Sequence, residues 1–309
     1  MTNEPASSTG PVPIPNTEDG GPGRKAYRGL AMEGSIARWY AKTRGSKGQL
    51  DQWRQQAVDL TRDLPDGAEV LEVAPGPGYF SVELARLGRV RVSAIDVSRT
   101  FVEMVAARAR AAGVEVSARL GDAAHLPFAD GSFDRIVCQA AFKNFSRPQT
   151  AVNEMYRVLR PGGRATIEDM RRDAPDAAIR DEVRAMQLGR LRGFLTLRTL
   201  RSLRRRAYSA EEFGRFAARS PFRRSESVLT PIGIELSMWK PIPDAASAGR
   251  ANQLGDPFEG RDGLGRLGRR SAVPVQPNGA QARPAGAEVV RLPAVADEEA
   301  VLGQAAGPA

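Results

Sequence analysis

The stretch Val70–Arg86, VLEVAPGPGYFSVELAR, runs from an apolar strand pattern through a turn with two prolines and two glycines into a helical pattern. In an open α/β sheet, the first turn from a strand into a helix usually forms the floor of a ligand site. Gly76 and Gly78 fall in this turn, and a residue without a Cβ lets the backbone adopt positive φ and approach a ligand closely. Pro75 and Pro77 restrict the loop. The stretch predicts a ligand-binding turn; a merely tight turn is the alternative.

Strand-like runs and helical patterns alternate on both sides of this turn. Strand candidates cover residues 69–74, 91–97, 114–122, 133–140 and 164–170, after two helical segments at 34–44 and 48–64. Strict alternation means right-handed crossovers and a parallel sheet. A capping box at Ser209 opens a later helix, and the two strand-like runs around Pro231 and Gly233 then predict an antiparallel hairpin.

Composition predicts one folded domain between two disordered ends. The chain has 309 residues with 31 Gly and 22 Pro. Residues 1–27 and 244–309 contain few large apolar side chains, so we expect both segments to be disordered around a domain at 28–243. Cys138 and His125 are the only cysteine and histidine, which argues against a disulfide framework and against a zinc site, and we expect no metal. No signal peptide or membrane-span pattern is present, so we expect a cytoplasmic protein.

Two acids near the turn indicate the kind of ligand. Asp96 ends the second strand 20 residues beyond Gly76, where a carboxylate can accept hydrogen bonds from two ribose hydroxyls. The segment GPGYFS nearly matches a dinucleotide fingerprint, with Ser81 in place of the third glycine. Glu72 argues against a nicotinamide dinucleotide, because a carboxylate there suits an ammonium group better than a pyrophosphate. The terminal hairpin also departs from the simple dinucleotide-binding pattern.

Four motifs in order resemble the class I S-adenosylmethionine-dependent methyltransferases. They are EVAPGPG (72–78), Asp96, GDAAHLPFADGSFDRIVC (121–138) and EMYRVLRPGG (154–163), and the most similar group is the family 11 type that includes ubiquinone and menaquinone methyltransferases. This resemblance implies a Rossmann-like three-layer sandwich, with a mostly parallel seven-stranded sheet and a C-terminal antiparallel hairpin. It also implies that S-adenosylmethionine is the cofactor.

The resemblance assigns cofactor-binding roles by position. Glu72, Gly76 and Gly78 would bind the methionine moiety, Asp96 the ribose, and Asp122 with Ala123 the adenine edge. Gln139 would line the methyl-donor pocket, and Val97 is grouped with these residues as the neighbour of Asp96. Ala74 stands where the family usually has glycine, a change that is tolerated where φ is negative.

No catalytic residue follows from the motifs, because methyl transfer from a sulfonium mainly requires alignment of the acceptor. The candidates are Asp169, Tyr40 and Asn144. Residues 28–64 would form N-terminal helices that act as a lid carrying Ile36, Trp39 and Tyr40, or that pack against the sheet edge.

The segment between the fifth and sixth strands is strongly basic. Residues 180–224 hold 13 arginines against four acids, in a chain of net charge +9. The resemblance implies that this region, 176–222, covers the substrate. The drift of its leucines around the helix axis predicts two short helices bent near 193–196. The mixture suits an apolar acceptor with an anionic group, or adhesion to an acidic membrane surface; a solvated basic face over buried leucines is the alternative.

We therefore expect an S-adenosylmethionine-dependent methyltransferase acting on a small-molecule acceptor, hydrophobic or quinone-like. The alternatives are an RNA methyltransferase that uses the Arg180 to Arg224 region, a non-catalytic nucleotide-binding protein and, last, a nicotinamide oxidoreductase. Against RNA, the sequence contains no Asn/Asp-Pro-Pro-aromatic signature. The sequence does not identify the acceptor or the oligomeric state.

Overall fold

The computed structural model describes residues 32–45, 47–222, 224–243 and 288–290. The segment predicted to be disordered at 1–27, and the one at 244–309 apart from 288–290, lie outside these residues. The elements in chain order are α1 (Gly34–Lys42), α2 (Lys47–Thr61), β1 (Ala68–Val73), α3 (Tyr79–Arg86), β2 (Val90–Asp96), α4 (Arg99–Ala111), β3 (Ser117–Leu120), β4 (Phe133–Gln139), the 3-10 helix η1 (Phe142–Asn144), α5 (Pro148–Val158), β5 (Leu159–Met170), α6 (Asp176–Ala185), α7 (Arg190–Arg206), α8 (Ala210–Ala218), β6 (Arg224–Leu229), β7 (Gly233–Trp239) and β8 (Glu288–Val290).

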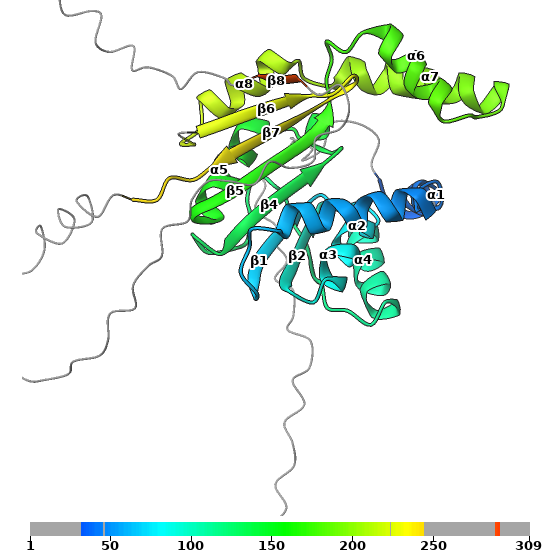
Figure 1. Cartoon of the computed structure of the whole chain (residues 1–309). Coiled ribbons are helices and arrows are strands. Elements are labelled where there is room, and N and C mark those ends of the chain that lie inside the picture. Colours follow the sequence, from blue (N-terminus) through cyan, green and yellow to red (C-terminus); the bar gives the residue numbers. More distant parts are fainter. Residues whose placement is uncertain (1–31, 46, 223, 244–287, 291–309) are drawn as a thin grey trace, which may run out of the picture.

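One mixed sheet organises the molecule, with strand order β3-β2-β1-β4-β5-β7-β6-β8 (Figure 1). Strands β1 to β5 pair in parallel, and β7 joins β5 antiparallel. The predicted hairpin is β6–β7, so the fold class is confirmed. The prediction of seven strands missed β8, which pairs antiparallel with β6. Nothing in the local pattern of residues 288–290 separated them from the rest of the tail.

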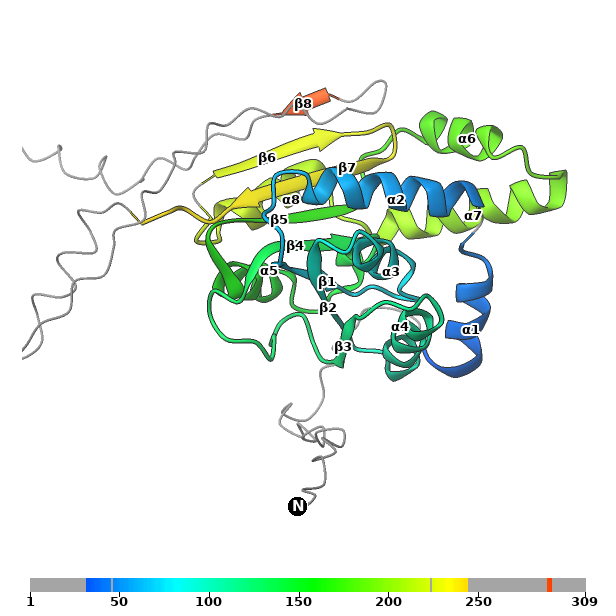
Figure 2. The same cartoon turned by 60° about the horizontal axis from the view of Figure 1, so that its bottom comes forward.

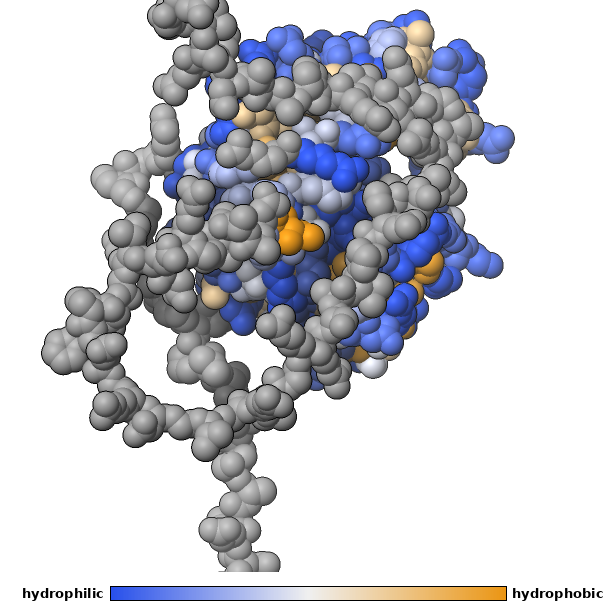
Figure 3. Space-filling model, turned by 60° about the vertical axis from the view of Figure 1, so that its left-hand side comes forward, coloured by the Kyte–Doolittle hydropathy of each residue, from blue (hydrophilic) through white to orange (hydrophobic). Residues whose placement is uncertain are grey.

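Helices cover both faces of the sheet, which gives three layers (Figure 2). On one face, Phe80 and Leu84 of α3 and Ala57 of α2 pack against the strand residues Val70 and Val92. On the other face, α5 and α8 bury the larger core. Each large apolar side chain in these layers contributes about 1.5–3 kcal/mol by leaving water. The outer surface in Figure 3 is mostly hydrophilic, with small separate apolar spots.

Helix caps fix where α4, α5 and α8 begin and end. Ser98 accepts a hydrogen bond from the Phe101 amide at the start of α4, and Ser209 and Glu212 form the predicted capping box of α8. Pro148 is the first residue of α5, where its fixed φ suits the first helical turn. Helix α5 ends at Val158, and residues 160–163 lie inside β5.

The predicted bend at 193–196 is wrong. Helix α7 runs unbroken from Arg190 to Arg206, and the chain instead turns between α6 and α7, where Gln187 has a φ of 49°. None of the residues of α7 is buried, so its leucines are not required to line up along one face of the helix. The alternative of a buried leucine core is therefore also wrong. Within the described residues, no helix is both long and apolar enough to span a bilayer.

Candidate active site

The glycine turn joins the end of β1 to the start of α3. Gly76 and Gly78 have φ of 54° and 78°, the left-handed region that glycine enters freely. A Cβ on Gly78 would lie 2.6 Å from Cγ2 of Val105 on α4, whereas a Cβ on Gly76 would meet no atom within 4 Å. Gly78 is therefore needed for the turn to pack closely on α4, whereas Gly76 borders open space.

The two glycines are expected to respond differently to alanine. Gly78→Ala should destabilise the fold by about 3 kcal/mol, because overpacking against Val105 adds to the strain of a positive φ. Gly76→Ala should cost only about 1 kcal/mol of stability yet weaken ligand binding, since its methyl group enters the open space. Urea denaturation and ligand titration of both variants measure the two effects. Equal losses of stability would contradict this division of roles.

Ala74 occupies a strained position. Its φ is +59°, so the negative φ under which alanine would be tolerated is not what the structure has. Its amide donates to the Ile95 carbonyl at 2.8 Å, and this contact between β1 and β2 helps to hold the backbone in place. An L-residue in the left-handed region costs roughly 1–2 kcal/mol.

Ala74→Gly is expected to stabilise the protein by about 0.5–1 kcal/mol, since relief of strain exceeds the added entropy of glycine in the unfolded chain. Chemical denaturation measures it. Ala94→Gly, in the middle of β2 and buried, is the matched control and should destabilise. A destabilised Ala74→Gly variant would show that the positive φ carries no strain.

Two buried carboxylates lie beside the turn. Glu72 is 3% and Asp96 is 6% exposed. The Oδ2 atom of Asp96 accepts from the Gly76 amide at 3.2 Å, and its Oδ1 accepts from the Ser98 amide at 2.9 Å. Glu72 accepts a hydrogen bond from the Ser81 hydroxyl. The structure thus brings Glu72, Gly76 and Asp96 together at the ends of β1 and β2, as the spacing predicted.

Burial makes both carboxylates unusually basic. It raises the pKa of Glu72 to about 7, with a further contribution from the negative charge of Asp96. It raises the pKa of Asp96 to about 6, although the amides of Ser98 and Gly76 favour its ionised form. Among the described residues, neither carboxylate has a salt-bridge partner within 4 Å. A ligand with a cationic group and hydroxyl donors would stabilise this pair.

The residues that the resemblance assigns to the adenine edge lie in the loop after β3. The Gly121 amide donates to the Asp96 carbonyl at 2.9 Å, which sets the loop after β3 beside the end of β2. Asp122 Oδ1 accepts from the Ala124 amide and its Oδ2 accepts from Arg147, while Ala123 is buried. Val97 leaves 40% of its surface exposed directly after Asp96. An exposed apolar side chain at this place suits the flat face of a base.

Gln139 belongs to a second polar group at the ends of β4 and β5. Its Nε2 donates to Glu168 at 3.2 Å and to Gln56 of α2 at 3.4 Å. Because Glu72 pairs with Val137, and Gln139 lies two residues further along β4, Glu72 and Gln139 point to the same face of the sheet. Burial, with the charge of Glu235 on β7, raises the pKa of Glu168 to about 7.

Asp169 points to the opposite face and is fully engaged by its own chain. Its carboxylate accepts from the Lys143 ammonium at 2.7 Å, from the Lys143 amide at 2.8 Å and from the Met170 amide at 2.7 Å. Its side chain is 0% exposed. These hydrogen bonds hold η1 against β5, and they occupy the carboxylate oxygens that a substrate would otherwise contact.

Asn144 and Tyr40 lie on segments that border the site. Asn144 ends η1 and is 9% exposed, and its Oδ1 has no hydrogen-bond partner among the described residues. Phe142 anchors η1 through ring contacts with Phe213 and Phe216 of α8, at 5.6 and 5.4 Å between centroids. Tyr40 on α1 lies 6.2 Å from the Phe101 ring, between centroids.

The N-terminal helices are attached to the site by contacts that the sequence did not predict. Glu33 accepts from the amides of Arg99 and Thr100 at the start of α4. The ring of Tyr79, the first residue of α3, stacks on Trp53 of α2 at 5.3 Å, and its hydroxyl donates to the Ala41 carbonyl at the end of α1. These pairs are 26 to 67 residues apart, so no local signal identifies them.

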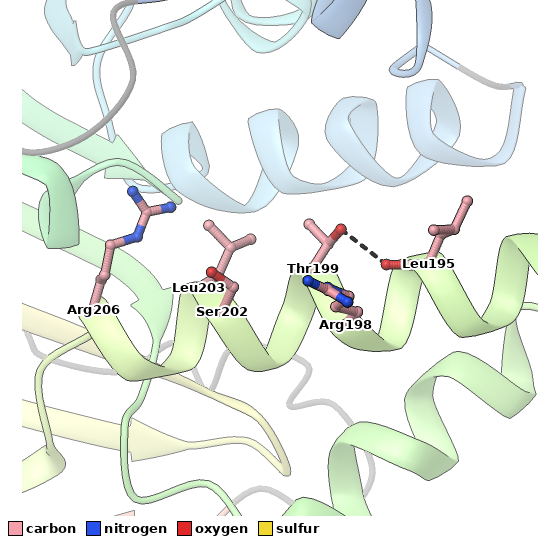
Figure 4. Close-up of a pocket in the computed structure, with 6 residues that line it drawn as sticks. All are labelled: Leu195, Arg198, Thr199, Ser202, Leu203 and Arg206. Carbon is pink, nitrogen blue, oxygen red and sulfur yellow. Dashed lines mark hydrogen bonds between the residues drawn. The ribbon is translucent and has the colours of Figure 1, made fainter.

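A surface cavity of about 360 Å³ lies along α7, and all of its lining residues belong to this helix (Figure 4). In the figure, Leu195, Leu203 and Arg206 point from α7 toward α2, the helix that carries Gln56. The lining combines apolar, hydroxyl and cationic side chains: Leu195, Arg198, Thr199, Ser202, Leu203 and Arg206.

Comparison with known proteins gives a family match inside the chain. Residues 71–167 match a family model described as a methyltransferase domain. The match begins in β1 and ends in β5, so it contains the glycine turn, Asp96 and Gln139. It confirms the resemblance to class I methyltransferases of the family 11 type.

Curated relatives share part of the chain. A demethylmenaquinone methyltransferase of Thermus thermophilus is 35% identical over 116 residues, which is 37% of this chain and 52% of that protein. Methyltransferase GfsG of Streptomyces halstedii is 38% identical over 143 residues, 46% of this chain and 49% of that protein. The chain thus spans about half the length of these relatives.

A solved structure supports the fold of the methyltransferase domain and of the elements around it. A putative S-adenosyl-L-methionine-dependent methyltransferase of Methanococcus maripaludis has a TM-score of 0.55 at 17% identity, covering 72% of this chain and 100% of that one. At this level of identity the likeness concerns the fold alone.

Proposed function

We propose that the protein transfers a methyl group from S-adenosylmethionine to a small, apolar, quinone-like acceptor. The observation that carries the proposal is the pair of buried carboxylates at the glycine turn, Glu72 and Asp96, inside a segment that matches a methyltransferase domain. The names of the relatives, among them a demethylmenaquinone methyltransferase, support the acceptor class. They favour it over the RNA alternative.

The residues of the turn would hold the methyl donor. The Glu72 carboxylate binds the ammonium of the methionine part, and Asp96 accepts from the two ribose hydroxyls. The open space at Gly76 takes the ligand against the backbone, Val97 covers one face of the adenine, and Asp122 with Ala123 borders its edge. The donor supplies a methyl group that is already activated by the sulfonium.

The chain then positions the acceptor and excludes water. Alignment of the two reactants contributes most of the rate, with effective molarities on the order of 10⁵ M or more. We place the acceptor at the cavity along α7, which lies inside the region 176–222 that the resemblance assigns to covering the substrate. Glu168, rather than Asp169, is the carboxylate placed to accept a proton from an acidic hydroxyl or carbon, because Asp169 is held by three donors.

Incubation with S-adenosylmethionine labelled in the methyl group tests this function. Quinols, phenols and polyprenylated quinols are the acceptors to compare, with transfer RNA as the alternative acceptor. We expect label in an extractable quinol or phenol product. Label only in RNA would refute the acceptor class, and binding of the donor without transfer to any acceptor would favour a non-catalytic protein.

A further inference from the structure

The turn between α6 and α7 carries an unusual group of exposed apolar side chains, here called the hairpin tip. Its members are 38% to 72% exposed. Apolar side chains of a surface helix normally face the core, yet no residue of α7 is buried. The hairpin tip consists of Met186, Leu188, Leu191, Phe194 and Leu195.

The exposed apolar residues of α7 lie on the face turned away from α6, here called the outward face. Leu191, Phe194, Leu195 and Arg198 recur at spacings of 3 and 4 and share one face of the helix. The opposite face packs on α6, and there Leu197 and Leu200 are partly covered. The outward face of the first two turns therefore has no partner within the described residues.

The surroundings of the hairpin tip are cationic and not neutralised. Residues 186–206 contain no acid. Three arginines at the base of the hairpin, Arg180, Arg201 and Arg204, pair with Asp176. Arg190 and Arg192, which flank Leu191, have no ion pair among the described residues. The charge beside the hairpin tip is thus available to an external anion.

Helix α1 presents a second apolar spot at the same end of the molecule. Trp39 is 67% and Ile36 is 38% exposed. Figures 1 and 2 both place α1 and the α6–α7 hairpin on the side toward which β4 and β5 run. Tryptophan favours the boundary between lipid and water.

We propose that the hairpin tip docks on the surface of an anionic lipid bilayer. Leu191 and Phe194 enter the boundary of the acyl chains, while Arg190 and Arg192 contact lipid phosphates. RNA would also attract the arginines, but it has no apolar interior into which the five exposed apolar side chains could insert. Because Leu195 belongs both to the hairpin tip and to the cavity along α7, docking would place the cavity next to the membrane.

Co-sedimentation of the full chain with vesicles tests this. Vesicles of phosphatidylglycerol and phosphatidylcholine in equal parts are compared with pure phosphatidylcholine, at 50 mM and 500 mM salt. We expect binding to the anionic vesicles that weakens with salt. Leu191→Ser with Phe194→Ser should weaken it about tenfold or more, and Arg190→Gln with Arg192→Gln about fivefold for each arginine removed.

Matched controls lie on exposed positions elsewhere. Ile242→Ser, at 73% exposure, and Arg219→Gln should leave vesicle binding unchanged. Circular dichroism and titration with S-adenosylmethionine check that every variant is folded, so a failure here is distinguishable from a failure of the proposed function.

Several outcomes would overturn the docking proposal. They are absence of binding to anionic vesicles at 50 mM salt, equal losses in the two control variants, and loss in the arginine variant without loss in the Leu191 and Phe194 variant. Tight binding of transfer RNA that depends on Arg190 and Arg192, without vesicle binding, would assign the surface to nucleic acid instead.

Discussion

Asp96→Ala is expected to weaken binding of S-adenosylmethionine about 10²- to 10⁴-fold. Two hydrogen bonds from ribose hydroxyls to a charged acceptor would be lost, each contributing about 1.5–3 kcal/mol. Isothermal titration calorimetry measures the change. Adenosine should lose affinity in the same proportion, because it carries the ribose.

Two further variants make the Asp96 result specific. Asp96→Asn keeps one acceptor oxygen and should show an intermediate loss. Asp66→Ala, an exposed carboxylate paired with Arg89, should bind as the wild type does. Equal affinity of Asp96→Ala and wild type for adenosine would remove the ribose assignment. Because Asp96 also holds the Gly76 and Ser98 amides, thermal unfolding must show that the variant is folded.

Glu72→Gln is expected to stabilise the free protein while weakening donor binding. Burial raises the pKa of Glu72 from 4.5 in the unfolded chain to about 7, so the folded state binds more protons between these values. Stability contributed by this group therefore falls as pH rises from about 5 to 8. At pH 8 the variant should gain about 3 kcal/mol, or about 6–12 °C in Tm for a domain of this size.

The same substitution should lower affinity for S-adenosylmethionine about 100-fold, since a neutral amide replaces the partner of an ammonium group. At pH 5 the gain in stability should vanish, because the wild-type carboxyl is then protonated. Glu69→Gln, on the same strand but paired with Arg91 at the surface, is the control and should change neither property. Unchanged affinity in Glu72→Gln would leave Glu72 with a structural role alone.

The parts of the fold that rest on local patterns were predictable from the sequence. Proline and glycine at 75–78 and the capping box at Ser209 act on their immediate neighbours, and the structure has the turn and the cap. The spacing between Gly76 and Asp96 also predicted a real contact, because adjacent parallel strands bring their ends together.

Features set by distant contacts were not predictable. The strand β8 pairs with β6 across about 60 residues, and Glu33 caps a helix 66 residues away. The positive φ of Ala74 follows from the meeting of β1, β2 and the turn, which overrides the local preference of alanine. The sequence placed a bend at 193–196 instead of the turn between α6 and α7. A shift in leucine periodicity marks a bend only where the leucines pack on one face, and no residue of α7 is buried.

The central claim is that the glycine turn with Glu72 and Asp96 holds a methyl donor. Its most direct test is calorimetric titration of the full chain with S-adenosylmethionine, S-adenosylhomocysteine and NAD. We predict binding of the first two and no binding of NAD at millimolar concentration. Binding of NAD alone, or no binding of either sulfur-containing ligand at millimolar concentration, would contradict it.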